Sequence, residues 1–337
     1  MKKIATSHFL LVIILLSQYV MAGMIHVANL DLPIAASIVL SQFTIILPFA
    51  IYCMVKKENP FRMIRFKKIK FKTALLAVAI ALFSYPVVVL LNMVSMIFVE
   101  NAMMNVMPDV LEMGLIPGLI LMAFLPAVVE ETIFRGMIYN TYSKRRPIIG
   151  IVLSALLFGL MHMNFNQLPY ALYLGIIMAL LMEACDSIIA PMIVHFTMNA
   201  TSSTLAFLTK DTLEEAAGAS TDLKSIILES YQMSSEQMGI EMSEAQLEEM
   251  LPMLMGGMIV VYGILALIAL AIVLTLVYAV FRSNNRLPKQ VFKADHSDTA
   301  YVMKKDGSMK KNRMVDVWLF IFIGYTIFQC LVSAGVL

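Results

Sequence analysis

The sequence predicts an all-α, polytopic integral membrane protein, a helical bundle with about nine transmembrane helices. Three observations favour this fold class: charges are scarce, nine apolar stretches are long enough to approach a membrane span, and the basic clusters fall on one side. Of the 337 residues, 60% are hydrophobic and 14% are charged, and the mean hydropathy is +0.82. Soluble domains carry roughly 25% charged residues. This chain has too few charges to cover a surface in water, so lipid is expected to cover much of its exterior.

The nine apolar stretches define the expected helices. A bilayer core about 30 Å thick requires roughly 20 apolar residues of helix. The fifth and sixth stretches are short and contain polar residues. We divide the chain into N-terminal helices over 1–114, a helical core over 115–208, an acidic loop over 209–251 and C-terminal helices over 252–337. The stretches are Phe9–Val27, Pro33–Val55, Thr73–Val99, Leu115–Tyr142, Pro147–Met163, Leu168–Ala184, Ser187–Leu208, Pro252–Phe281 and Val315–Val336.

The loops between these stretches predict the orientation in a cell membrane. Basic residues cluster before the first span and after the second, fourth and eighth, so every cluster falls on one side of the membrane. The positive-inside rule makes that side the cytoplasm and places the N-terminus there. The acidic loop falls on the opposite side. The clusters lie at Lys2–Lys3, Lys56–Lys72, Lys144–Arg146 and Arg282–Lys293.

The basic segment Lys56–Lys72 interleaves aromatic and aliphatic side chains with its charges. Such a segment suits contact with anionic membrane lipids, and we expect no nucleic-acid partner. Within the first span, Val20-Met21-Ala22 resembles a signal-peptidase site. We favour a retained helix, because the apolar stretch continues to Val27. Cleavage there would leave the orientation of the remaining spans unchanged.

Polar groups at membrane depth are the candidates for function. Insertion of one charged residue costs about 2.5–3.5 kcal/mol, so such residues are rare and default to functional hypotheses. They fall in the fourth, fifth and seventh spans. These candidates are Glu130, Glu131, Arg135, His162, His195 and the nearby amide Asn199.

Their depths agree. With a rise of about 1.5 Å per residue, Glu130 lies about 18 Å from the basic end of its span and His162 about 22 Å. On the same rise, His195 and Asn199 lie about 12 and 18 Å from the basic end of theirs. Three helices therefore place polar groups in one slab of the membrane. Because this slab lies within reach of the basic side, we expect the site to open toward the cytoplasm.

Helical spacing indicates which of these groups share a face. Glu131 and Arg135 are four residues apart, in the order that favours an ion pair. Glu130 points about 100° away from Glu131 on a helix with 3.6 residues per turn. Glu130 is therefore the freer carboxylate, and we expect Glu131 and Arg135 to support and orient the site.

Two further pairs have the same spacing. Phe158 and His162 share a face, so the phenyl ring is expected to pack beside the imidazole and fix it. His195 and Asn199 share a face as well. A carboxylate next to an imidazole can hold and deprotonate a water molecule, and a second imidazole with an amide NH₂ can donate to an oxyanion. This set of groups suits amide hydrolysis.

Other interpretations remain open. Glu130, His162 and His195 could ligate one zinc ion and leave an open position, although the one-helix HExxH signature is missing. The cofactor is therefore either absent or one zinc ion. The polar residues could instead form structural contacts between helices or a proton-coupled transport pathway. Transport is disfavoured because the chain shows no paired inverted halves.

The order of these motifs resembles a known family. Glu130-Glu131-Thr-Ile-Phe-Arg135 matches the EExxxR motif of the CPBP family, which includes type II CAAX prenyl endopeptidases and their bacterial Abi relatives. Phe158–His162 matches the FxxxH motif of this family, and His195–Asn199 matches its HxxxN motif. The resemblance covers about 115–208, under a third of the chain.

The resemblance implies an all-α intramembrane peptidase in which Glu130 and His162 activate water and His195 with Asn199 stabilises the oxyanion. It implies a membrane-embedded or lipid-anchored peptide substrate, either prenylated or of bacteriocin type. Members of the family are commonly named metalloproteases, and a metal-free glutamate mechanism has also been proposed for them. We favour the metal-free version. The alternative function is a catalytically silent membrane scaffold or immunity protein with the same fold.

Overall fold

The computed structural model describes most of the chain. The described residues are 4–101, 106–143, 146–210, 244–293, 301–303, 309–311 and 315–337, together with 224, 227, 228, 231 and 235. Most of the expected acidic loop and the basic residues 2–3 and 144–145 lie outside the described residues. The statements below concern the described residues alone.

All nine apolar stretches are helical, and the all-α fold class is confirmed. The fourth stretch is one continuous helical body made of five segments with different hydrogen-bond spacing. The remaining stretches each form one α-helix. The bounds are α1 Ile4–Val27, α2 Ile34–Lys56, α4 Phe71–Met96, then α6 Leu115–Gly118, η2 Leu119–Phe124, α7 Leu125–Glu131, η3 Thr132–Tyr139 and α8 Asn140–Ser143, followed by α9 Pro147–Met161, α10 Leu168–Cys185, α11 Ile189–Leu208, α14 Glu244–Ser283 and α15 Val317–Ser333.

Not every helix is long enough to span a membrane alone. Six helices in the described parts of the chain have the length and apolar composition of a span, and the fourth stretch, Leu115–Ser143, counts as one of them. Both α9 and α15 are apolar but shorter than 18 residues. By the length and apolar composition of these helices, the chain is a multi-pass membrane protein. The exact number of nine spans stays a prediction.

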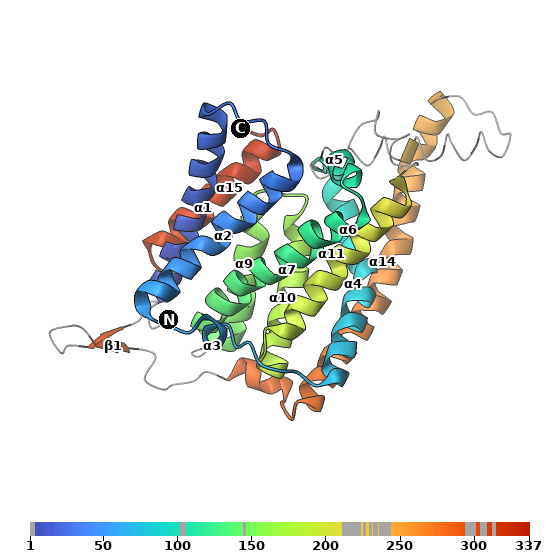
Figure 1. Ribbon diagram of the computed structural model, residues 1–337. Helices are drawn as coiled ribbons and strands as arrows, with labels where there is room; N and C mark the ends of the chain where they lie inside the picture. The colour runs from blue at the N-terminus through green and yellow to red at the C-terminus, as the bar shows by residue number, and fades with distance from the viewer. Residues whose placement is uncertain are drawn as a thin grey trace.

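The helices are arranged around a central group that carries the candidate residues. In Figure 1, α1, α2 and α15 lie on one side of the bundle, α4 and α14 lie on the other, and α7, α9, α10 and α11 lie between them. Close packing holds the centre together. A Cβ atom at Gly175 in α10 would lie 2.8 Å from Cα of Ala155 in α9, so only glycine allows these two helices their approach.

Two segments of the fourth stretch are π-helical, which the sequence did not indicate. Segment η2 precedes α7 and segment η3 follows it, so the α-helical turn with Glu130 and Glu131 lies between two wider turns. A π-helix forms i→i+5 hydrogen bonds and is frequent at functional sites. Depths calculated with the α-helical rise are therefore only approximate along this stretch.

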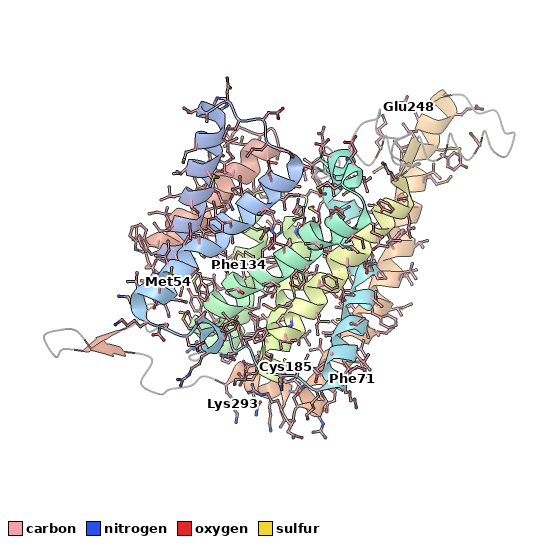
Figure 2. The ribbon with its side chains drawn as sticks, viewed as in Figure 1. Met54, Phe71, Phe134, Cys185, Glu248 and Lys293 are labelled. Carbon is pink, nitrogen blue, oxygen red and sulfur yellow. The ribbon has the colours of Figure 1, made fainter. Side chains whose placement is uncertain are left out.

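The basic clusters gather at one end of the bundle. Asp186 lies between α10 and α11 and accepts hydrogen bonds from Arg65 at 3.1 Å and from Lys67. Arg286, which follows α14, donates to the Glu183 carbonyl at 2.7 Å. In Figure 2, Phe71, Cys185 and Lys293 lie at this end, which we call the basic face, and Glu248 lies at the opposite end. The identification of the basic face with the cytoplasm stays a prediction.

The segment after α2 is folded against the basic face. It contains one helical turn, α3 Pro60–Met63, which Asn59 caps by accepting from the Arg62 N–H at 3.1 Å. Ile64 is buried, and a Cβ atom at Gly136 would lie 2.6 Å from its Cγ2 atom. The basic segment is therefore tied to the core helices through an apolar contact as well as through its charges.

The C-terminal third differs from expectation in two places. Helix α14 begins at Glu244, eight residues before the expected start at Pro252, and continues through that proline. Two short strands, β1 Tyr301–Met303 and β2 Met309–Lys311, form an antiparallel pair that the all-helical prediction did not include. Earlier in the chain, helix α5, Met107–Glu112, also lies outside the expected stretches. None of these additions changes the fold class.

Candidate active site

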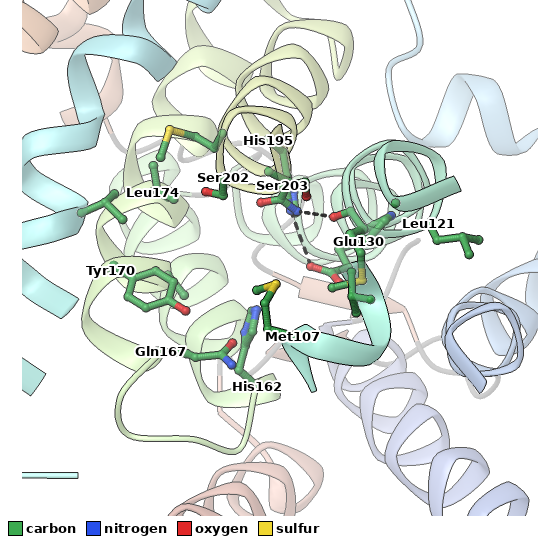
Figure 3. Close-up of a pocket in the computed structure, with 18 of the residues that line it drawn as sticks. Met107, Leu121, Glu130, His162, Gln167, Tyr170, Leu174, His195, Ser202 and Ser203 are labelled. Atoms are coloured by element: carbon green, nitrogen blue, oxygen red, sulfur yellow. Dashed lines mark hydrogen bonds and ion pairs between the residues drawn. The ribbon is translucent and has the colours of Figure 1, made fainter. Parts of the chain in front are cut away.

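The predicted site residues meet at one cavity inside the bundle. The cavity has a volume of about 740 Å³, and Glu130, His162, His195 and Asn199 all line it. They come from α7, the C-terminal end of α9, and α11. Figure 3 shows Glu130, His162 and His195 around the same space. The structure thus brings together four residues that the sequence separates by up to 69 positions, and their catalytic roles stay predictions.

Glu130 is the accessible carboxylate of the adjacent pair. Its side chain is 18% exposed, whereas that of Glu131 is fully buried. One carboxylate oxygen lies 3.9 Å from Nε2 of His195, and the other lies 3.5 Å from the side-chain nitrogen of Gln42 on α2. Glu130 is therefore positioned from two sides and still faces the cavity, as a group that acts on water must.

Glu131 contacts both Arg135 and His195 behind the cavity. Its Oε1 atom accepts from Nη1 of Arg135 at 2.8 Å and lies 2.9 Å from Nδ1 of His195. The expected ion pair with Arg135 is present, across the wider π-helical turn. The contact with His195 was not anticipated. Because a carboxylate on Nδ1 fixes the tautomer and orientation of an imidazole, Glu131 presents Nε2 of His195 to the cavity.

Arg135 is fully buried and stacks its guanidinium against Phe158, 4.5 Å from the ring centroid. Its Nε and Nη2 atoms and Oε2 of Glu131 are buried without a hydrogen-bond partner among the described residues. An uncompensated buried charge costs several kcal/mol. Removal of either Glu131 or Arg135 would therefore leave the other charge buried without its partner.

The imidazole of His162 is fixed by its own helix end. Its Nδ1 atom lies 2.9 Å from the Phe158 carbonyl oxygen, to which it donates, and the Phe158 ring packs edge-on at 5.0 Å between centroids. This is the expected Phe158–His162 contact. With Nδ1 protonated, Nε2 of a neutral imidazole keeps its lone pair. His162 can therefore accept a proton or a hydrogen bond from water.

The side chain of Asn199 is held by a backbone carbonyl. Its amide donates to the Met122 carbonyl at 3.0 Å. Met122 lies in the π-helical segment η2, next to α7, so this bond connects α11 to the stretch that carries Glu130. A primary amide has two N–H groups, so one remains for a ligand in the cavity.

The proposed zinc ligands do not form a metal site. Among the described residues, no three His, Cys, Asp or Glu side chains come together at a spacing that could hold a metal ion. Glu130 and His195 are close, but their nearest atoms are 3.9 Å apart, and His162 completes no such group with them. The donor set therefore does not fit the tetrahedral zinc site of a peptidase, and we derive no step through zinc.

The cavity lies toward the end of the bundle opposite the basic face, whereas we expected the site to open toward the basic side. Its lining residues come from the first turns of α2, the second half of α4, α11 from Val194 onward and α10 from Tyr170 to Met178. Distance along each helix from its basic end, on which the expectation was based, does not show which turns line the cavity.

Residues 112–201 match the family described as type II CAAX prenyl endopeptidase Rce1-like. This segment belongs to the Rce1-like family. The match spans Glu130 to Asn199 and therefore every predicted site residue, and it agrees with the resemblance to CPBP proteins. No match was found among curated proteins or among solved structures.

The description of the matched family names a protease, and the match is confined to the segment that carries the predicted site residues. The Rce1-like segment covers α6 to α11 apart from the last turns of α11. The flanking helices α1, α2, α4, α14 and α15 lie outside it. Two residues that sequence analysis missed, Gln42 and Met122, contact the site residues. Gln42 could have been found, because a glutamine within an apolar span is unusual. Met122 could not, because it contributes only its backbone carbonyl.

Proposed function

We propose that the protein hydrolyses a peptide bond of a membrane-associated substrate with a water molecule activated by Glu130 and His162. The observation that carries the proposal is the convergence of Glu130, His162, His195 and Asn199 on one cavity from three separate helices. A carboxylate and an imidazole placed beside one space can share the protons of a bound water molecule. The remaining two residues supply hydrogen-bond donors there.

The chemical steps follow from the tautomers and partners described above. The water oxygen attacks the carbonyl carbon of the scissile bond and gives its proton to Glu130, while Nε2 of His162 accepts a hydrogen bond from the other water proton. The tetrahedral intermediate then collapses and the C–N bond breaks. Glu130 returns the proton to the leaving nitrogen, so the carboxylate is regenerated.

The oxyanion of the intermediate receives its hydrogen bonds from α11. The second N–H of Asn199 is one donor, and Nε2 of His195 is the other when the ring carries protons on both nitrogens. The carboxylates of Glu130 and Glu131 lie on opposite sides of this ring. Donors held in place before the reaction stabilise the developing charge without reorganisation.

The substrate class is a peptide presented at the membrane. The name of the matched family supports a prenylated CAAX peptide as one candidate, and the resemblance to the Abi group supports a bacteriocin-like peptide as another. The cavity has room for several residues, because ligand sites of about 300–1,000 Å³ hold drug-sized molecules.

The test is a cleavage screen with the purified protein in detergent. A farnesylated CAAX peptide and a panel of unmodified membrane peptides are each incubated with the wild-type protein and with Glu130→Gln, and the products are identified by mass spectrometry. We expect at least one peptide to be cut by the wild type alone. If no peptide is cut and a Glu130→Ala strain retains the cellular phenotype of the wild type, the protein is a scaffold or immunity factor.

A further inference from the structure

The cavity occupies only one half of the bundle. Helix α2 begins at the end opposite the basic face, and the cavity contacts it between Ser37 and Gln42. Helix α11 ends there, and the cavity contacts it from Val194 to Phe207. The contacts with α4, which also ends there, run from Tyr85 to Asn92. We call this end the distal face.

Polar contacts at the basic face lie outside this cavity. Asp186 bonds Arg65 and Lys67, and Arg286 lies 3.8 Å from the same carboxylate. Ser187 donates to the Lys67 carbonyl, which ties the segment after α2 to the start of α11. None of these residues lines the cavity. A separate apolar cavity of about 1020 Å³ lies toward this end between α2, α7 and α11, but none of the four candidate residues lines it.

The cavity is almost free of charge. Among the described residues that line it, Glu130 is the one Asp, Glu, Lys or Arg. The other polar groups are two histidines, hydroxyls such as Ser203, and amides such as Asn92 and Gln167. Hydroxyl and amide groups pair well with a peptide backbone. A charged substrate side chain would lose its hydration without finding a partner.

A second cavity meets the first at the proposed catalytic pair. It has a volume of about 370 Å³, and Glu130 and His162 line it together with Gln18 and Tyr19 of α1. Ser41 and Gln42 of α2 border both cavities. An extended chain lying across Glu130 and His162 would therefore have space on both sides of its scissile bond.

We propose that the substrate is an uncharged peptide segment that enters from the distal face and lies across Glu130 and His162 with residues in both cavities. The proposal rests on the proposed function and deepens it. If the basic face is cytoplasmic, as the positive-inside rule predicts, the segment is presented on the outer side of the membrane. A prenylated C-terminus in the cytoplasm would then be on the wrong side.

The side of access is tested by labelling single cysteines in a background where Cys53, Cys185 and Cys330 are replaced by alanine and cleavage is first verified. Ser203→Cys reports on the cavity, and Lys293→Cys, an exposed residue at the basic face, is the matched control. A bulky, membrane-impermeant maleimide is added to either side of sealed vesicles. We expect the two positions to be labelled from opposite sides.

Activity distinguishes the possible outcomes. Labelling of Ser203→Cys should lower cleavage at least about tenfold relative to the same unlabelled variant, because the adduct fills the cavity, and labelling of Lys293→Cys should leave cleavage unchanged. If Ser203→Cys is labelled from the side of Lys293→Cys, or from neither side, the proposal is overturned. The proposed function would stand, since cleavage in detergent is measured separately.

The charge requirement is tested with a peptide that the protein cuts in detergent. A lysine or an aspartate replaces each residue next to the scissile bond, and glutamine or asparagine at the same position serves as the uncharged control. We expect kcat/KM to fall about a hundredfold for the charged peptides, in line with the penalty for an unpaired charge at membrane depth. Equal cleavage of charged and uncharged peptides would contradict the proposal.

Discussion

Oε1 of Glu131 lies 2.9 Å from Nδ1 of His195, so a carboxylate outside the cavity orients an imidazole inside it. The same oxygen accepts from Arg135 at 2.8 Å. Glu130, one residue earlier, instead faces the cavity and lies 3.9 Å from the other nitrogen of His195. Two adjacent glutamates therefore contact the two ends of one imidazole ring, and they are expected to have different functions.

Glu130→Gln should abolish cleavage and leave the protein folded, because it removes the proposed base and keeps the side-chain volume. The measurements are kcat with a substrate from the screen and the thermal unfolding temperature, Tm. Gln42→Ala is a useful companion, since it removes the amide 3.5 Å from Glu130 and should lower kcat less. Near-normal cleavage by Glu130→Gln would refute the assignment of the base.

Glu131→Gln should reduce both folding yield and activity. Removing one partner from a buried ion pair costs about 3–5 kcal/mol, and His195 also loses the carboxylate that orients it. The double variant Glu131→Gln/Arg135→Gln separates these effects, because it leaves no unpaired charge. We expect the double variant to regain stability but not kcat. Recovery of both would show that Glu131 has a structural role alone.

Asn199→Ala should lower kcat by about 10²–10³, the range for loss of one oxyanion donor. KM should change much less, because that charge exists only in the transition state. The variant also loses its bond to Met122, at a cost of about 1 kcal/mol. Thr201→Ala removes a hydroxyl that bonds within the same helix and serves as the control. A loss confined to Tm would assign Asn199 to structure.

Chelation should leave cleavage unchanged, since no group of three suitable ligands gathers among the described residues. His195→Ala should then resemble Asn199→Ala, with a reduced kcat and little change in KM. The measurements are activity and zinc content before and after dialysis against a chelator. Stoichiometric zinc that is lost together with activity, and restored with it, would establish the zinc mechanism instead.

The basic face should respond to acid through Asp186. Burial alone would raise the pKa of this carboxyl, but Lys67, Arg65 and Arg286 outweigh it and hold the pKa below its ordinary value. The charged form therefore stabilises the fold above about pH 3.9, and this contribution is lost as the pH falls through the lower folded-state pKa.

Asp186→Asn measures that contribution. At neutral pH its Tm should lie about 2–4 °C below that of the wild type, as for loss of a partly exposed ion pair. The difference should shrink as the pH falls below about 3.9 and vanish below the lower folded-state pKa, where the carboxyl of the folded wild type is also neutral. A difference that persists unchanged in acid would show that the charge of Asp186 contributes nothing.

The helices and the candidate residues could be predicted from the pattern of apolar and polar residues along the chain. Long apolar stretches have few alternatives in a bilayer, where every backbone group must be paired internally. This is why the expected and observed ends of α2 and α10 differ by a single residue. Glu130, His162 and His195 stood out for the same reason, because a polar group in such a stretch is costly.

The pairing of these groups and the position of the cavity depend on contacts between helices that are distant in the sequence. The contacts of His195 with Glu131 and of Asn199 with Met122 join residues 64 and 77 positions apart, and no local spacing encodes them. The contacts of Asp186 with Arg65 and Lys67 likewise join residues 121 and 119 positions apart. Side-chain chemistry selected the candidates, and packing between distant helices set their geometry.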